Sequence, residues 1–326
     1  MPEQPKIVAD IGLVIYPDSQ LAAVYGLTDL FRIASEISEA QAQSRPTAIR
    51  VSHWRRDPVD GVIGCVYDSH PGQPHKLSHL IAPPSLIMPE KMQSMSGFSG
   101  WLLDHHAGGA TICSVCAGAF VLGEAGLLDG REVTTHWAFA EELARRFPTI
   151  RVDVDRIMID DGDVITAGGI LAWTDLGLSL VERFMGPSIM LDTARFLLAD
   201  PPGRTQQPYR HFLPRRDHGD LAILRSQHWM HATSAKEVSV PELARRAELE
   251  ERTFLRRFRK ATGLRPTEYA QQIRISKARE ALELSNRSVE QIAWQVGYSD
   301  PSAFRRLFQR VTGLTPNEYR QRFGVN

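Results

Sequence analysis

The sequence has few of the features that mark membrane, secreted and metal-binding proteins. It contains no run of about 18 apolar residues, and its first six residues lack the apolar stretch of a signal peptide. It has only 3 cysteines in 326 residues, and no histidine lies at a zinc-ligand spacing from cysteine or carboxylate. We therefore expect a soluble, cytoplasmic protein without membrane contact, metal ion or cofactor.

Two of the three cysteines, Cys113 and Cys116, form a C-x-x-C pair. The pattern predicts that Cys113 lies in a β-strand, where three residues span about 10 Å. That separation is too large for disulfide geometry, so we expect no redox pair. Cys65 is most simply a small, buried apolar residue.

The net charge of zero conceals two segments of opposite charge. Residues 220–326 contain 19 Lys and Arg against 12 Asp and Glu, whereas residues 1–219 contain 19 basic and 26 acidic residues. A basic segment attached to an acidic one is typical of a nucleic-acid-binding module fused to a module that does not bind nucleic acid.

A segment rich in proline, glycine and polar residues separates the two parts. Residues 199–219 show neither helical nor strand periodicity, which is typical of a linker. The sequence therefore predicts a first domain at 1–198, a linker at 199–219 and a second domain at 220–326. We expect the linker residues Tyr209 and Phe212 to dock on the first domain.

The second domain contains an internal repeat. Residues 239–247 align with 288–296, and 254–273 align with 304–323. The phrase Thr-Gly-Leu-x-Pro-x-Glu-Tyr occurs in both copies. A register that holds over some thirty residues indicates two copies of one structural unit.

Each copy has the pattern of two helices joined by a tight turn. In the second copy, Ser288 can cap a short helix, Gly297 suits the turn, and Asp300 and Pro301 begin the next helix. This is helix-turn-helix geometry. The apolar positions of that helix recur at 3.6-residue spacing and leave a basic face exposed. We expect the aromatic side chains of both copies in the core: Phe254, Phe258, Trp294, Phe304 and Phe308.

The two units, joined by a long helix at 266–284, resemble the DNA-binding domain of AraC/XylS-type bacterial regulators over residues 220–323. The first copy departs from the family pattern at two positions. Glu248 replaces a frequent glycine and Glu250 replaces a frequent serine cap. We therefore expect weaker helix capping and weaker phosphate contact in the first copy.

The resemblance implies that two recognition helices, near 251–261 and 301–311, enter successive major-groove segments about 34 Å apart. The base-reading positions that it implies are Arg252, Arg256, Ser302, Arg305 and Arg306. The phosphate contacts that we expect are Arg257, Lys260, Arg279 and Arg310.

The first domain alternates predicted strands and helices. We expect strands at 7–16, 49–53, 62–67, 80–82, 110–115, 157–159 and 164–166. We expect helices at 21–38, 97–106, 117–125, 137–147 and 171–185. This alternation predicts an α/β sandwich with a largely parallel sheet, whose binding sites lie at the C-terminal ends of strands. The second domain is predicted to be all-α.

One predicted strand runs directly into a helix and places Cys116 on the turn between them, as in a nucleophile elbow. The helix N-terminus there is expected to lower the pKa of Cys116. With the phrase Thr134-Thr135-His136-Trp137, the segment resembles the ThiJ/PfpI superfamily, which is related to class I glutamine amidotransferases, over residues 6–186. The resemblance implies a flavodoxin-like fold, and a cysteine that attacks carbonyl groups in the enzymes.

Three departures predict that the chemistry is lost. Ala117 stands where protease-like members have the catalytic histidine, and Ala23 stands at the carboxylate position. Pro84 replaces a glycine at the oxyanion site, and proline has no N–H to donate. His136 remains as a candidate partner for Cys116. We therefore expect a degenerate elbow and no enzyme activity.

The fusion of these two domains resembles the GlxA-type subgroup of AraC-family regulators. That resemblance implies a DNA-binding regulator, dimeric through its first domain, that senses an amino acid, amine or related nitrogen compound and contacts RNA polymerase if it is an activator. The expected effector-pocket residues are Tyr16, Pro17, Cys116, Ala117, His136, Gly168 and Gly169. Two alternatives remain: an active cysteine hydrolase, amidase or glyoxalase-like enzyme, and a redox sensor that uses Cys116.

Overall fold

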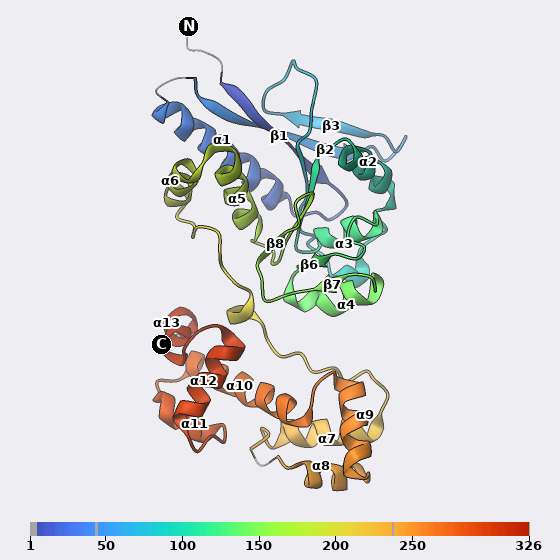
Figure 1. Cartoon of the computed structure of the whole chain (residues 1–326), viewed down its shortest axis with the longest axis vertical. Helices are drawn as coiled ribbons and strands as arrows, with labels where there is room; N and C mark the ends of the chain where they lie inside the picture. Colours follow the sequence, from blue (N-terminus) through green and yellow to red (C-terminus); the bar gives the residue numbers. More distant parts are fainter. Residues whose placement is uncertain (1–4, 43–44, 237, 326) are drawn as a thin grey trace. The chain divides into compact units, whose positions relative to one another are not determined.

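The computed structural model describes residues 5–42, 45–236 and 238–325. The chain divides into two compact units, Met1–Gln206 and Gln207–Asn326 (Figure 1). The division falls inside the segment for which the sequence predicts a linker.

The first unit is built on a seven-stranded sheet with the order β3-β2-β1-β4-β5-β9-β8. Its strands are β1 (Lys6–Ile15), β2 (Thr47–Arg56), β3 (Ile63–Asp68), β4 (His79–Ala82), β5 (Thr111–Val115), β8 (Met158–Asp160) and β9 (Val164–Ala167). Only the β2/β3 and β8/β9 pairs are antiparallel among these strands. The prediction of a largely parallel α/β sheet is confirmed. A separate pair of two-residue strands, β6 (Glu132–Val133) and β7 (Arg151–Val152), was not predicted.

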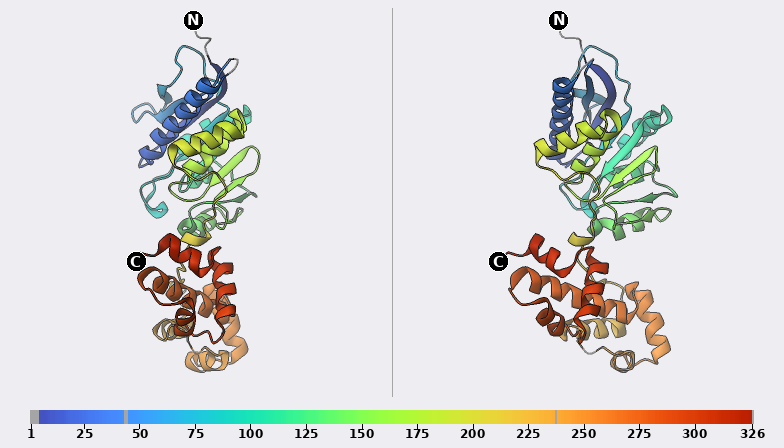
Figure 2. Two further views of the ribbon diagram at one scale, coloured as in Figure 1. Left: turned by 90° about the vertical axis from the view of Figure 1, so that its left-hand side faces the viewer. Right: turned by 60° about the vertical axis from the view of Figure 1, so that its left-hand side comes forward.

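Helices cover both faces of this sheet (Figure 2). On one face lie α1 (Leu21–Gln41), α5 (Trp173–Met185) and α6 (Pro187–Leu197), and on the other lie α2 (Ser96–Ala107) and α3 (Gly118–Glu124). The short α4 (Ala140–Arg146) packs beside β7. Gly26 lets α1 approach α5 closely, because a Cβ there would lie 2.5 Å from the Trp173 indole.

The central strands are buried on both faces. Ile11, Leu13, Leu80, Ile81 and Ile112 are at most 1% exposed. Strands of this kind have continuous apolar sequences, which is why the sequence pattern located them. Their parallel order brings the C-terminal ends of β1, β4, β5 and β9 to one edge of the sheet.

The second unit consists of two helical halves. The first half contains α7 (Leu221–Ala232), α8 (Val240–Ala247) and α9 (Glu251–Thr262), and the second contains α11 (Val289–Gln295), α12 (Pro301–Thr312) and α13 (Pro316–Phe323). The long α10 (Pro266–Leu284) supplies apolar residues to the separate core of each half. Phe254 and Phe258 occupy one core at the positions that Phe304 and Phe308 occupy in the other, which confirms the repeat. The prediction for Trp294 was wrong, because that side chain is 59% exposed.

The two copies differ in their helix caps, as the sequence predicted. Asp300 accepts hydrogen bonds from the backbone N–H groups of Ser302 and Ala303 at the start of α12. Glu250, at the start of α9, makes no such bond. Glu248 adopts a φ of 56°, in the left-handed region where glycine is less strained. The first copy is therefore less well capped than the second.

We expect Glu250→Ser to stabilise the helical unit by about 1 kcal/mol, because serine can satisfy an N–H group at the start of α9. The matched change in the second copy, Asp300→Ala, should cost about 1 kcal/mol by removing the cap bonds. Both changes can be measured as shifts in thermal unfolding of the full chain. A loss of stability in Glu250→Ser would show that Glu250 has a structural role that its cap geometry does not reveal.

Candidate effector site and candidate nucleic-acid interface

Cys116 lies on the turn between β5 and α3 with a φ of 54°. Its backbone N–H donates to the carbonyl oxygen of Ala167 on β9 at 2.7 Å. The side chain is only 2% exposed, and burial raises the pKa of Cys116 to about 12. The predicted lowering of this pKa was wrong, because desolvation of a thiolate outweighs the hydrogen bonds from the backbone N–H groups of Ala117 and Gly169.

Tyr16 lies beside Cys116, and its pKa is raised by burial and by that neighbour. The Tyr16 hydroxyl donates to the carbonyl oxygen of Pro83 at 2.5 Å. Two backbone hydrogen bonds join the same two loops, which follow β1 and β4. The Gln20 N–H donates to the Pro84 carbonyl oxygen at 2.7 Å, and the Leu86 N–H donates to the Asp18 carbonyl oxygen at 2.9 Å. The thiol is therefore buried beside Tyr16, and these three hydrogen bonds join the loops that follow β1 and β4.

Two carbonyl oxygens lie close to the helix that follows the elbow. A Cβ on Gly118 would lie 2.2 Å from the carbonyl oxygen of Ala82 and 2.8 Å from that of Pro83, so these oxygens lie against the start of α3. A carbonyl oxygen cannot donate a hydrogen bond to an oxyanion. At the superfamily's carboxylate position, Ala23 is fully buried and carries no ionisable group.

Next to the elbow, the side chain of Gln206 lies near His136 and Gly168 and forms hydrogen bonds with backbone groups. Its Nε2 donates to the carbonyl oxygen of Thr135 at 2.9 Å, and its Oε1 accepts from the Trp137 N–H at 3.0 Å. A Cβ on Gly168 would lie 2.0 Å from this Nε2. His136 Nδ1 accepts from the Ala138 N–H at 3.1 Å. Gln206 was not predicted from the sequence, because nothing in a proline- and glycine-rich segment distinguishes one glutamine.

An open pocket of about 620 Å³ adjoins Tyr16 at the C-terminal ends of β1 and β2. Tyr16 and Pro17 line it together with Arg55 and Arg56. The predicted effector-pocket residues therefore separate into two places. Tyr16 and Pro17 line this pocket, whereas Cys116, Ala117 and Gly168 are buried around the elbow, and His136 and Gly169 are half-buried.

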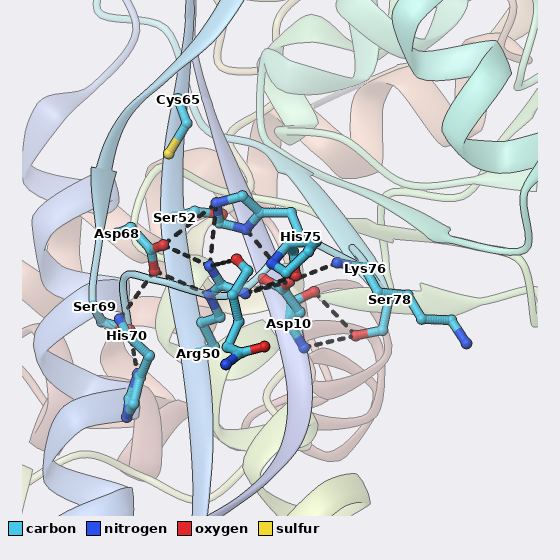
Figure 3. Close-up of polar contacts among 12 residues, drawn as sticks. Asp10, Arg50, Ser52, Cys65, Asp68, Ser69, His70, His75, Lys76 and Ser78 are labelled. Carbon is cyan, nitrogen blue, oxygen red and sulfur yellow. Dashed lines mark hydrogen bonds and ion pairs between the residues drawn. The ribbon is translucent and has the colours of Figure 1, made fainter.

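A buried ionic network joins β1, β2 and β3 in the same unit (Figure 3). Arg50 is 4% exposed; its guanidinium donates to the Asp68 carboxylate at 2.6 and 3.0 Å and lies 3.6 Å from the Asp10 carboxylate. His75 lies 3.4 Å from each carboxylate. Cys65 on β3 is exposed, so the expectation that it is buried was wrong, and all three cysteines are free thiols.

In the second unit, the predicted base-reading side chains lie exposed on α9 and α12. The exposed residues are Arg252, Arg256, Ser302, Arg305 and Arg306, and the predicted phosphate contacts Lys260 and Arg310 are exposed on the same two helices. Arg305 forms an ion pair with Glu290, and Arg306 lies 3.8 Å from Asp300. Because Arg256 and Arg306 are equivalent in the repeat, the two helices present arginine at the same position.

Two predicted phosphate contacts are engaged within the unit. Arg279 is 4% exposed; it donates to the carbonyl oxygens of Gln207 and Arg210, and its guanidinium lies 5.4 Å from the Tyr319 ring centroid. This placement contradicts the prediction for Arg279, because a buried guanidinium does not face a phosphate. Arg257 pairs with Asp220, the N-cap of α7, at 2.7 Å.

The linker aromatics also pack differently from the prediction. The Tyr209 ring lies 5.5 Å from that of Phe323, and the Phe212 ring lies 5.0 Å from that of Tyr269, both measured between centroids. These contacts belong to the second unit, so the expectation that both rings dock on the first domain was wrong. The sequence indicates that these aromatic rings are buried by packing, but it does not show which unit they pack against.

The fold thus combines an α/β unit containing an enclosed cysteine elbow with a duplicated helix-turn-helix unit. Family comparison gives the same two parts. Residues 85–183 match the DJ-1/PfpI family, and residues 243–322 match a helix-turn-helix domain. The chain therefore carries a DJ-1/PfpI-family domain followed by an AraC-type helix-turn-helix domain, as the sequence resemblance indicated.

Two similar proteins are transcriptional regulators. CdhR from Pseudomonas aeruginosa is 29% identical over 63% of this chain and 61% of its own length. GlxA from Rhizobium meliloti is 30% identical over 60% of each chain. The chain thus spans about three fifths of the length of the regulators that it matches. Isonitrile hydratase from Pseudomonas putida is 40% identical, but over 26% of this chain and 35% of that enzyme.

Proposed function

We propose that this protein is a sequence-specific DNA-binding transcriptional regulator whose first unit senses a small metabolite. The observation that carries the proposal is the duplicated helix-turn-helix unit with exposed arginines at equivalent positions, Arg256 and Arg306. Its fusion to a DJ-1/PfpI-family domain, and the similarity to regulators such as CdhR and GlxA, support the same proposal.

In this proposal, α9 and α12 enter successive major-groove segments, and the arginines read guanine edges by paired hydrogen bonds. Lys260 and Arg310 contact phosphates and add affinity without sequence preference. A homodimer formed through the first unit would place two such DNA-binding units on paired half-sites and raise the effective affinity for DNA. We place the protein in the cytoplasm, where RNA polymerase would be its partner at promoters that it activates.

We infer that the first unit binds its effector without transforming it. Three observations support this inference: the buried Cys116 thiol has a raised pKa, Ala23 carries no carboxylate, and Pro84 has no backbone N–H to donate. Burial and the raised pKa also disfavour a redox sensor, because oxidation and nucleophilic attack require an accessible thiolate.

Residues 204–207 offer a route by which the first unit could act on the second. Arg204 forms an ion pair with Asp175, and Gln206 lies beside Gly168. The next residue, Gln207, begins the second unit, where its carbonyl oxygen accepts from Arg279 at 3.2 Å. We propose that an effector alters regulation by changing how this segment is held in the first unit.

Variants of Cys116 test whether the function of the first unit requires a reaction at the thiol. We expect the full chain to show no turnover of methylglyoxal or model amides above that of Cys116→Ala, because the thiol is neutral and enclosed. We also expect the DNA affinity of the wild-type chain and of Cys116→Ser to be unchanged by hydrogen peroxide. Turnover that disappears in Cys116→Ala would support an enzyme, and a peroxide effect that disappears in Cys116→Ser would support a redox sensor.

Selection from a random duplex DNA pool with the full chain tests the proposed function itself. We expect enrichment of sites in which two short conserved segments lie about ten base pairs apart, one for each recognition helix. Recovery of DNA without any enriched sequence would reject the proposal of a sequence-specific regulator.

A further inference from the structure

The pocket beside Tyr16 has the properties of a small-molecule site. Its volume of about 620 Å³ lies within the range of about 300–1,000 Å³ that is common for such sites. Its apolar wall includes Tyr16, Met95 and Phe98, each at most 3% exposed overall. Its polar lining includes Arg55 and Arg56 at the end of β2 and Asp57, which follows them.

These two arginines have no partners within the described residues. Neither Arg55 nor Arg56 forms an ion pair or a side-chain hydrogen bond in that part of the chain. The nearby acids are already engaged. Asp57 Oδ1 accepts from the Val59 N–H at 2.7 Å, and Glu124 Oε2 accepts from the Ser94 hydroxyl at 2.9 Å. Among the residues that line the pocket, two arginines therefore stand against the single carboxylate of Asp57.

Two glycines set the path of the Arg56 side chain. A Cβ on Gly61 would lie 2.5 Å from Arg56 Nη2, and a Cβ on Gly97 would lie 2.9 Å from Arg56 Nε. Gly61 has a φ of 75°, and Gly97 lies in the first turn of α2. The guanidinium thus lies against two positions without side chains, so its place at the pocket does not depend on an ion pair.

We propose that this pocket binds a small organic carboxylate and that this carboxylate is the effector. A guanidinium matches a carboxylate with two parallel hydrogen bonds, and a second arginine in the lining favours an anion over a neutral molecule. The apolar part of the ligand packs against Phe98, Met95 and the Tyr16 ring. The role as effector rests on the proposed function, whereas the binding site itself does not. The site lies beside the closed cysteine elbow rather than in it.

Tyr16 connects this pocket to the rest of the unit. Tyr16 is one of the residues that line the pocket, its hydroxyl donates to the Pro83 carbonyl oxygen, and it lies beside Cys116. A ligand in contact with Tyr16 therefore touches a residue that also adjoins the elbow. Through Tyr16, a bound carboxylate can alter the conformation of the C-terminal edge of the sheet without any reaction at the thiol.

Binding can be measured with the full chain by thermal shift and calorimetry. The probes are butyrate, glutarate and phenylacetate, each compared with its uncharged amide, together with inorganic phosphate. We expect at least one carboxylate to raise the unfolding temperature while its amide does not. In Arg56→Gln and Arg55→Gln, the dissociation constant should rise about tenfold or more, because each loses a charged hydrogen-bond donor. The control Arg195→Gln, an exposed arginine on α6, should bind as the wild-type chain does.

The proposal is overturned if no carboxylate binds, if the amides bind equally well, or if the Arg55→Gln/Arg56→Gln double variant keeps the wild-type affinity. Phosphate binding without carboxylate binding overturns the ligand class. DNA affinity measured with and without the bound carboxylate separates the two proposals. A carboxylate that binds but leaves DNA affinity unchanged contradicts its role as effector, and failure of DNA selection contradicts the proposed function whatever the carboxylates do.

Discussion

Replacing Arg50 by methionine should lower the free energy of unfolding of the first unit by about 3–5 kcal/mol. Arg50 lies between the buried carboxylates of Asp10 and Asp68 and donates to the carbonyl oxygens of Gln73 and Pro74. Methionine preserves much of the volume but leaves both carboxylates without their shared cation. The Trp54 ring lies 5.1 Å from His75 in this network, so tryptophan fluorescence during urea unfolding can report the loss.

The loss should depend on pH. The hydrogen-bonded guanidinium of Arg50 lowers the pKa of Asp68 below its usual value. A carboxyl with a depressed folded-state pKa stabilises the fold above its unfolded pKa of about 3.9, and that stabilisation disappears as the pH falls through the folded-state pKa. The difference between wild type and Arg50→Met should therefore be larger at about pH 7 than in acid.

Two further variants make the Arg50 result specific. Arg50→Met/Asp68→Asn should recover part of the stability, because one of the uncompensated charges is removed. Arg32→Met, on the exposed face of α1, should change stability by less than about 0.5 kcal/mol. Equal, small losses in Arg50→Met and Arg32→Met would mean that the network does not hold β1, β2 and β3 together.

For DNA binding, Arg306→Ala should cost about 1–3 kcal/mol on the selected site and relax the preference at one base pair. Its side chain is exposed on α12, at the position equivalent to Arg256 on α9. Arg310→Ala, which removes a proposed phosphate contact on the same helix, should weaken all sequences alike and reduce the salt dependence of binding. Fluorescence anisotropy at several salt concentrations separates the two effects.

Arg279 supplies a matched contrast for these DNA measurements. Its guanidinium is buried against the carbonyl oxygens of residues 207–210, so Arg279→Ala should lower stability without lowering the salt slope. Equal losses of Arg306→Ala and Arg310→Ala on selected and random DNA would contradict the assignment of Arg306 to base reading.

The sequence predicted what depends on local chemistry and periodicity. The caps at Ser288 and Asp300 follow from short side chains that can accept a backbone N–H, and the structure confirms both. The apolar runs located the seven strands of the main sheet, and the two copies of the helix-turn-helix unit appeared from their shared register. These features depend on residues that are neighbours in the chain.

The features that the sequence did not predict depend on distant contacts. Arg279 is buried because residues about seventy positions earlier lie against it, and the same face of a helix without that cover would be exposed. The pKa of Cys116 was predicted in the wrong direction because only the fold shows that the thiol is buried beside Tyr16. Arg55 and Arg56 were overlooked, although two consecutive arginines at the end of a largely buried strand could have been noticed.

The central claim is that this chain reads DNA sequence. The most direct test is the ratio of the dissociation constants of the full chain for the selected duplex and for a scrambled duplex of the same composition, at one physiological salt concentration. The account predicts a preference of about a thousandfold or more for the selected duplex. A ratio near one would mean that the basic helical unit only recognises phosphate charge, and would contradict the account.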